Sequence, residues 1–173
     1  MCDFPVEGYE IIHLDTGTFM WVAVTRFAAA ADDDRATLAT LITSPGYADD
    51  CISPPELTPK TIDQFSVHGR WWLTAITIDS FMPITADAAF DRIRVWANDQ
   101  PWTDPDYYQP PDVFERLETV REALRSGTVY TLANPSEEHE HEYGWVVGGM
   151  GFHEFVVIDR DREIVSVIVA ADD

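Results

Sequence analysis

Histidine and glutamate alternate in one short run of the chain, Glu137 to Glu142. Imidazole nitrogens and carboxylate oxygens are common ligands of zinc and other transition metals. His139 and His141 are two residues apart, so on an extended backbone their side chains would point the same way, and His153 could add a third ligand. The spacing is not that of H-E-x-x-H, which places two histidines on one helical face, so a solvated loop is the alternative interpretation.

A cysteine and a histidine could form a second kind of site. Cys51 and His68 have the side chains of a nucleophile and its base, but such a pair needs spatial contact and a third, orienting group. The sequence around Cys51 carries no recognised signature, and a buried, unreactive cysteine is the alternative. Asp79 interrupts an apolar stretch, where a carboxylate would need a partner, a raised pKa or a position at a strand end facing solvent. No residue is assigned a catalytic role, and no cofactor is expected.

Large aromatic and acidic side chains gather in the proline-rich segment 98–110. Aromatic rings often anchor protein interfaces, and neighbouring carboxylates would suit arginine or lysine on a partner. The same rings could instead fold back and cover the sheet. The residues predicted to form a partner surface are Trp102, Asp104, Asp106, Tyr107 and Tyr108.

The charge of the chain is its most extreme property. Its 31 acidic and 11 basic residues give a formal net charge of -20 at pH 7. This surplus disfavours broad contact with nucleic acid or an anionic membrane, because both require a basic patch. It permits a basic protein partner, attracted by the electrostatic field. The single lysine, Lys60, and the abundance of aspartate would also fit a bias of the genome or adaptation to salt.

Hydrophobic periodicity predicts strands near both ends of the chain and helices between them. The expected strands cover 9–15, 18–27, 70–81, 128–133 and parts of 143–173, and the expected helices cover 28–43, 85–97 and 111–125. Segment 70–81 is apolar on both faces, which is typical of a central strand. Strands and helices do not alternate regularly. The sequence therefore predicts an α+β fold: a mainly antiparallel sheet of about six to seven strands, two or three helices packed on one side, and a C-terminal β-hairpin.

The C-terminal hairpin is predicted from two β-branched runs joined by a short charged link. If Asp159 faced Glu163 across a three-residue loop, one apolar face would contain His153, Phe155, Val157, Val165, Val167 and Val169. A slip of one residue would exchange the two faces of the hairpin.

The length of the chain fits a single globular domain, residues 1–173. Cys2 and Cys51 do not make a disulfide framework, which favours reduced thiols and a cytoplasmic protein. The N-terminus lacks the pattern of a signal peptide, and no apolar run approaches the roughly 18 residues of a membrane span. We expect a non-enzymatic module that binds a basic protein, such as an inhibitor or immunity-type protein. The alternative is a small-molecule-binding protein or hydrolase with a pocket between sheet and helices, in one version assisted by a metal.

Overall fold

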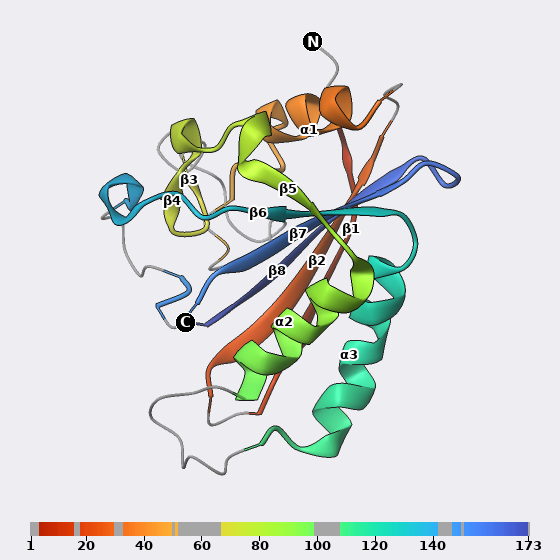
Figure 1. The fold of residues 1–173 in the computed structure, drawn as a ribbon, viewed down its shortest axis with the longest axis vertical. Helices are drawn as coiled ribbons and strands as arrows, with labels where there is room; N and C mark the ends of the chain where they lie inside the picture. Colours follow the sequence, from red (N-terminus) through yellow and green to blue (C-terminus); the bar gives the residue numbers. More distant parts are fainter. Residues whose placement is uncertain are drawn as a thin grey trace.

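The computed structural model describes residues 4–15, 18–29, 33–49, 51, 67–98, 108–141, 147–149 and 151–172. Within these ranges a six-stranded antiparallel sheet has the order β1-β2-β8-β7-β6-β5 (Figure 1). Its strands are β1 (Val6–His13), β2 (Met20–Ala28), β5 (Phe81–Ile84), β6 (Thr128–Leu132), β7 (His153–Asp159) and β8 (Ile164–Asp172). A separate pair contains β3 (Val67–His68) and β4 (Trp71–Trp72). The C-terminal hairpin, β7–β8, forms the middle of the large sheet.

In the part of the chain that the structure describes, three helices cover the sheet: α1 (Asp34–Thr43), α2 (Ala86–Asn98) and α3 (Pro111–Leu124). Each begins where the sequence provides a start signal. Asp33 accepts a hydrogen bond from the N–H of Ala36 at 2.8 Å, the Thr85 hydroxyl accepts one from Ala88 at 3.2 Å, and Pro111 occupies the first turn of α3. In the described part of the chain, no helix is long and apolar enough to cross a membrane.

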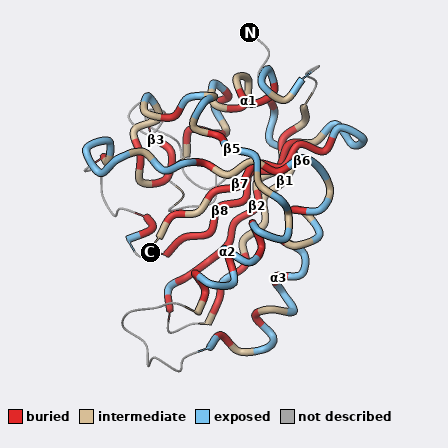
Figure 2. The backbone as a smooth tube through the Cα atoms, viewed as in Figure 1, coloured by how far each residue is buried: buried red, intermediate tan, exposed pale blue. Residues whose placement is uncertain are grey.

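The two faces of the sheet have separate cores. Helices α2 and α3 pack on one face, against Val22, Phe155 and Ile168. On the other face, α1 and β4 pack against Phe27 and the valines of β8. The central strands are therefore buried on both sides, while the outer surfaces of α2 and α3 are exposed (Figure 2). The predicted α+β fold with an antiparallel sheet is confirmed.

The predicted register of the C-terminal hairpin is wrong by one residue. Asp159 pairs with Ile164, and Phe155 pairs with Ile168. The connecting turn has four residues, 160–163, because Asp159 Oδ1 accepts a hydrogen bond from the N–H of Arg162 at 3.1 Å and Glu163 takes a left-handed conformation with φ 55°. Phe155 consequently faces α2 and α3, whereas the valines of β8 face the opposite core.

Segment 70–81 is not the predicted central strand. It contains β4 and two 3-10 turns, Leu73–Ala75 and Ile78–Ser80, and reaches the large sheet only with the edge strand β5. Thr77 caps the second turn together with Ser80, which ends any extended conformation there. Pro83 has no N–H to donate and suits an edge strand. Asp79 lies exposed in this turn and pairs with Arg35, so the solvent-facing alternative for this residue is the correct one.

Candidate functional site

Three polar side chains from distant parts of the chain meet on the face of the sheet that α1 and β4 cover. Tyr47 follows α1, His68 lies on β3 and Glu154 lies on β7, and each is at most 2% exposed. The Tyr47 hydroxyl donates to Glu154 Oε1 at 2.8 Å, while Glu154 Oε2 pairs with His68 Nε2. His68 Nδ1 donates to the carbonyl oxygen of Tyr47 at 2.6 Å, and the two rings stack 3.8 Å apart. We call these three residues the buried cluster.

Mutual charge shifts the pKa values inside the buried cluster. Burial by itself lowers the pKa of His68, but the Glu154 carboxylate, the Tyr47 carbonyl and Asp49 outweigh it, so the pKa lies above its usual 6.5. Burial and the Glu154 charge raise the pKa of Tyr47 well above 10. The tyrosine hydroxyl therefore stays protonated at neutral pH, and the charges of His68 and Glu154 compensate each other.

Cys51 lies beside the buried cluster, close enough for a thiolate there to raise the pKa of Tyr47. Its N–H donates to Asp49 Oδ1 at 3.1 Å, and its backbone has φ 62°. The structure thus brings Cys51 and His68 together, as a nucleophile pair would require. However, both ring nitrogens of His68 already have partners in the buried cluster. His68 therefore has no nitrogen left to take the thiol proton, and the geometry does not support a Cys–His nucleophile.

A hollow opens above the buried cluster, between the sheet and the segment that follows α1. It holds about 380 Å³ of empty space, counting the part open to solvent. Four aromatic residues line it, together with valines from β8 and a few polar groups. The aromatic residues are Tyr9, Trp21, Phe27 and Tyr47; the others include Thr25, Asp49, Cys51, His68, Val167 and Val169. The room inside it is about 20 Å³, enough for about one water molecule and far less than a usual small-ligand site offers.

Only part of the predicted partner surface is described. Trp102, Asp104, Asp106 and Tyr107 lie outside the described residues. Tyr108 is described and is 73% exposed. The Tyr108 ring is thus not packed on the sheet, and the partner surface as a whole stays a prediction.

The side chain of Gln109, next to Tyr108, ties three segments together. Its amide oxygen accepts from the N–H of Asp15 at 3.0 Å, and its amide nitrogen donates to the carbonyl of Ala97 at 3.0 Å and contacts the sulfur of Met20. The turn between β1 and β2 is thereby held against the end of α2 (Figure 1).

Phe19, adjacent to Met20 in that turn, is 70% exposed and has φ 53°. Gln109 contacts Met20 and precedes α3, so Phe19 and Tyr108 are exposed at the same end of the molecule. We call these two residues the aromatic end. No pattern in the sequence marks Phe19 as a surface residue, because a phenylalanine beginning a β-branched run is usually a core residue.

The three histidines considered as metal ligands have different surroundings. His139 is exposed and bonds to the hydroxyl of Ser136 at 3.0 Å. His141 is buried and bonds through Nε2 to the carbonyl of Gly69 at 2.7 Å. His153 lies on β7 against the Trp96 ring. Among the described residues, no group of three or more histidine, cysteine or acidic side chains could hold a metal ion, so the metal site stays a prediction.

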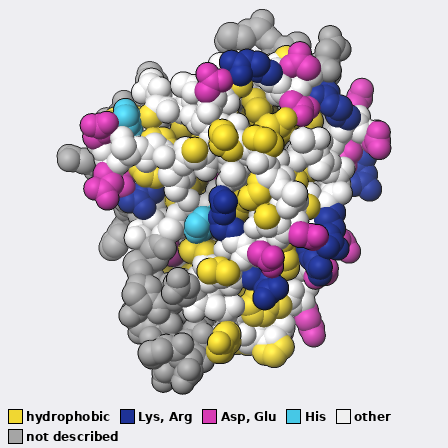
Figure 3. All heavy atoms as spheres, viewed as in Figure 1, with side chains coloured by type: hydrophobic (Ala, Val, Ile, Leu, Met, Phe, Trp, Pro, Cys, Tyr) yellow, Lys and Arg dark blue, Asp and Glu magenta, His cyan; other side chains and the backbone are white. Residues whose placement is uncertain are grey.

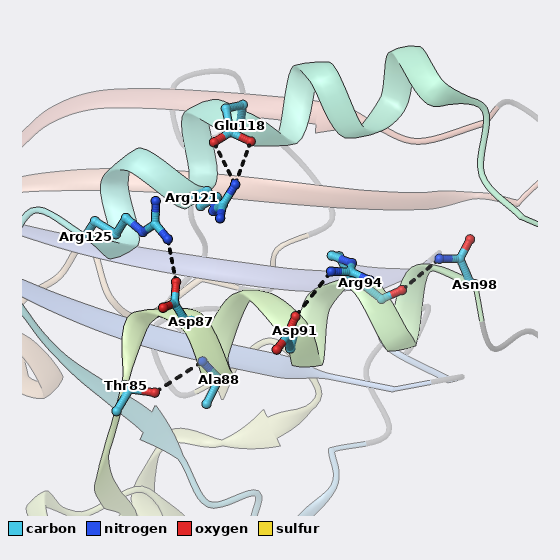
Figure 4. Close-up of polar contacts among 9 residues, drawn as sticks. All are labelled: Thr85, Asp87, Ala88, Asp91, Arg94, Asn98, Glu118, Arg121 and Arg125. Atoms are coloured by element: carbon cyan, nitrogen blue, oxygen red, sulfur yellow. Dashed lines mark hydrogen bonds and ion pairs between the residues drawn. The ribbon is translucent and has the colours of Figure 1, made fainter.

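The arginines of the molecule are largely neutralised within it. All ten arginines are described, and nine of them form an ion pair with an aspartate or glutamate. On α2 and α3 these pairs include Arg94 with Asp91 and Arg121 with Glu118 (Figure 4), and basic and acidic groups lie side by side on this face (Figure 3). Such exposed pairs add little stability. They do cancel most of the positive charge that could repel a basic partner.

Comparison of the chain with protein-family models, with curated proteins and with solved structures gives no match. The function must therefore be inferred from the geometry of the aromatic end, the buried cluster and the hollow.

Proposed function

We propose that the protein is a non-enzymatic binding module whose partner is a basic protein surface. The observation that carries the proposal is the aromatic end, where Phe19 and Tyr108 are 70% and 73% exposed. Large aromatic side chains held on a fixed backbone are favoured anchors of protein interfaces, because they bury much area for little loss of entropy. Gln109 provides the fixed backbone through its bonds to Asp15 and Ala97.

The charge of the chain supports a basic partner. The net charge is -20, and nine arginines already pair with acids inside the molecule. A basic protein would be attracted by this field and would associate faster at low ionic strength. An inhibitor or immunity-type protein that neutralises a basic enzyme or toxin would have these properties.

Affinity capture at two salt concentrations tests the proposal. The immobilised protein should retain a basic protein from a lysate of its source at low salt and release it at high salt, because surface charges are screened. With the captured protein purified, Tyr108→Ala should weaken binding about thirtyfold, as expected for an interface anchor. Phe19→Asn removes the second ring and keeps a residue type that tolerates positive φ.

Met82→Ala is the matched control, because Met82 is also an exposed apolar residue, 54% exposed, but lies on the edge strand β5. It should bind as the wild type does. Association that is equally fast at both salt concentrations would contradict the basic partner. Unchanged affinity of the Tyr108→Ala variant would contradict the aromatic end as the interface.

The alternative function, the binding of a small molecule, would use the hollow between the sheet and the segment after α1. The lining of the hollow is mostly aromatic and aliphatic, but its room of about 20 Å³ is small, so this alternative has less support than the aromatic end. A hydrolase would need an activated nucleophile there, and in the described part of the chain both nitrogens of His68 have other partners. Binding without reaction is therefore the better form of this candidate.

A further inference from the structure

We infer that Arg92 and His153, on the surface where α2 meets β6 and β7, bind the carboxylate of a short-chain carboxylic acid. This site lies on the face of the sheet opposite the hollow, and it does not depend on a protein partner at the aromatic end. Three observations carry the inference: the uncompensated charge of Arg92, the donors around it, and the exposed apolar side chains beside it.

Arg92 differs from every other arginine of the chain. The other nine form an ion pair with an aspartate or glutamate, whereas Arg92 has no such partner among the described residues. This is unexpected in a chain with 31 acidic and 11 basic residues. Arg92 is exposed on α2, where the adjacent Asp91 pairs with Arg94. Its positive charge is therefore not compensated within the described part of the chain, and it can bind an anion.

The guanidinium of Arg92 is held in a fixed position with most of its donors unused. Its Nη1 donates to Thr131 Oγ1 at 3.0 Å, and Thr131 donates in turn to the carbonyl of Glu154 at 3.3 Å. The guanidinium also lies over the ring of the buried Phe155, 5.9 Å from its centre. A guanidinium has five N–H donors, and Arg92 makes only this one hydrogen bond to the described residues. The remaining donors can form the paired bonds that arginine makes with carboxylates.

His153 provides a second donor beside the guanidinium. It is two residues before Phe155 on β7, so both side chains are on the face of the sheet that α2 covers. Burial, and then the charge of Arg92, lower the pKa of His153 to about 4, so at neutral pH the ring is uncharged and keeps one N–H. The ring lies edge-on to Trp96, but it makes no hydrogen bond to a described residue.

Gly151 leaves space in front of this ring. A Cβ atom at position 151 would lie 3.1 Å from His153 Nε2, so any side chain there would crowd that nitrogen. With glycine, a carboxylate oxygen can approach the ring while the second oxygen accepts from Arg92.

Two exposed apolar side chains define the rest of the ligand. Met82 pairs with Thr131 across the sheet, and Val95 lies one turn after Arg92 on α2, so both border the guanidinium. A carbon chain would cover them, whereas an inorganic anion would gain nothing from them. The net charge of -20 opposes anions from a distance, but salt screens this field beyond about 10 Å. A short-chain carboxylate satisfies both the charge and the apolar side chains.

The experiment compares n-butyrate with 1-butanol, which has the same carbon chain and no charge, and with acetate, which has the same head and a shorter chain. Binding is measured at pH 7 and physiological ionic strength by calorimetry and by NMR of the His153 ring. We expect saturable binding of n-butyrate that is about tenfold tighter than that of 1-butanol, because only the carboxylate forms charge-assisted hydrogen bonds. Acetate should bind more weakly than n-butyrate.

Two results of this comparison would overturn the inference. Equal affinity for n-butyrate and 1-butanol, or no saturable binding of either, would exclude a carboxylate site. Acetate that binds as tightly as n-butyrate would mean that the carbon chain makes no contact with Met82 and Val95.

A pair of arginine variants connects the binding to this site. Arg92→Gln removes the uncompensated charge and should weaken n-butyrate about tenfold without weakening 1-butanol. Arg94→Gln is the matched control, because it removes the same charge from the same helix but from an arginine already paired with Asp91. It should bind as the wild type does. Wild-type affinity in Arg92→Gln, or equal weakening in both variants, would overturn the site.

His153→Phe tests the second donor. The variant keeps a ring against Trp96 but has no nitrogen, so it should weaken n-butyrate about fivefold, as expected for the loss of one hydrogen bond. The affinity for 1-butanol should not change. An affinity for n-butyrate equal to that of the wild type would overturn the placement of the carboxylate between His153 and Arg92.

Discussion

The imidazole of His68 and the carboxylate of Glu154 form an ion pair inside the protein, and both side chains are buried. The pair joins the two-residue strand β3 to the central strand β7 across 86 positions of sequence. Removing two charges from water costs several kcal/mol each, and only close pairing with satisfied hydrogen bonds offsets this cost. Tyr47 supplies both remaining bonds, from its hydroxyl to Glu154 and at its carbonyl to His68. The buried cluster therefore holds β3 and the segment after α1 in one specific position on the sheet.

Glu154→Leu should reduce the free energy of unfolding by about 3–5 kcal/mol, because it leaves the imidazole of His68 buried without its counter-charge. The double variant Glu154→Leu, His68→Phe leaves neither charge and should be more stable than the single variant. Urea unfolding of the wild type, Glu154→Leu, His68→Phe and the double variant gives the coupling free energy between the two side chains.

Asp87→Asn is a useful control for this cycle, because it breaks the exposed pair of Asp87 with Arg125 (Figure 4). We expect its stability to stay close to that of the wild type. If Glu154→Leu, the double variant and Asp87→Asn were all equally stable, the ion pair of His68 and Glu154 would contribute nothing to stability.

The pH dependence of stability should show the raised pKa of His68. The unfolded chain has a histidine pKa of about 6.5, and the folded value is higher, so the folded state binds the proton more tightly. This contribution is complete below pH 6.5 and is lost as the pH rises through the folded pKa. The stability advantage of the wild type over the His68→Phe, Glu154→Leu variant should therefore shrink at alkaline pH. An NMR titration of the His68 ring with a midpoint at or below 6.5 would contradict this.

The fold class follows from local patterns, but the buried cluster does not. The stripes of α2 and α3 and the β-branched runs are visible in the sequence and are enough to predict an α+β fold. The position of Glu154 depends on the hairpin register, which the turn at 160–163 decides. With the predicted register, Glu154 falls on a mixed, partly wet face. With the observed register it pairs with Val169 and faces the core that α1 and β4 cover.

The partners of Glu154 are even less visible in the sequence. Tyr47 lies in a segment without periodicity, and His68 lies on a strand of only two residues. Their contact with β7 is a matter of topology, which hydrophobic periodicity does not encode. In segment 70–81, by contrast, the sequence pattern is present but misleading. Its apolar alternation predicts a central strand, whereas the turn capped by Thr77 and Ser80 interrupts the extended backbone.

The contribution of His153 to stability should depend on pH with the opposite sign to that of His68. Burial, and then the charge of Arg92, lower its pKa to about 4 in the folded protein. The folded state prefers the neutral ring, so its contribution to stability is present above pH 6.5 and is lost as the pH falls toward 4. The stability difference between the wild type and His153→Gln should decrease over that range.

Arg92→Gln separates the two causes of this shift. Because burial is the larger cause, the NMR midpoint of His153 should rise in this variant but stay below 6.5. A midpoint at 6.5 would mean that the arginine charge alone causes the shift. An unchanged midpoint would mean that Arg92 has no effect on the ring.

Gly127, between α3 and β6, should not tolerate a side chain. A Cβ atom there would lie 2.5 Å from the carbonyl carbon of Ile158, which is backbone of the central strand β7 and has little room to move. Gly127→Ala should therefore reduce the free energy of unfolding by about 2 kcal/mol or more. Gly8→Ala is the matched control, because nothing lies within 4 Å of the added atom. It should leave stability unchanged or raise it by about 0.4–1 kcal/mol, by restricting the unfolded chain. Urea unfolding of both variants checks the prediction, and equal effects would mean that the sheet moves away from α3 to accept the methyl group.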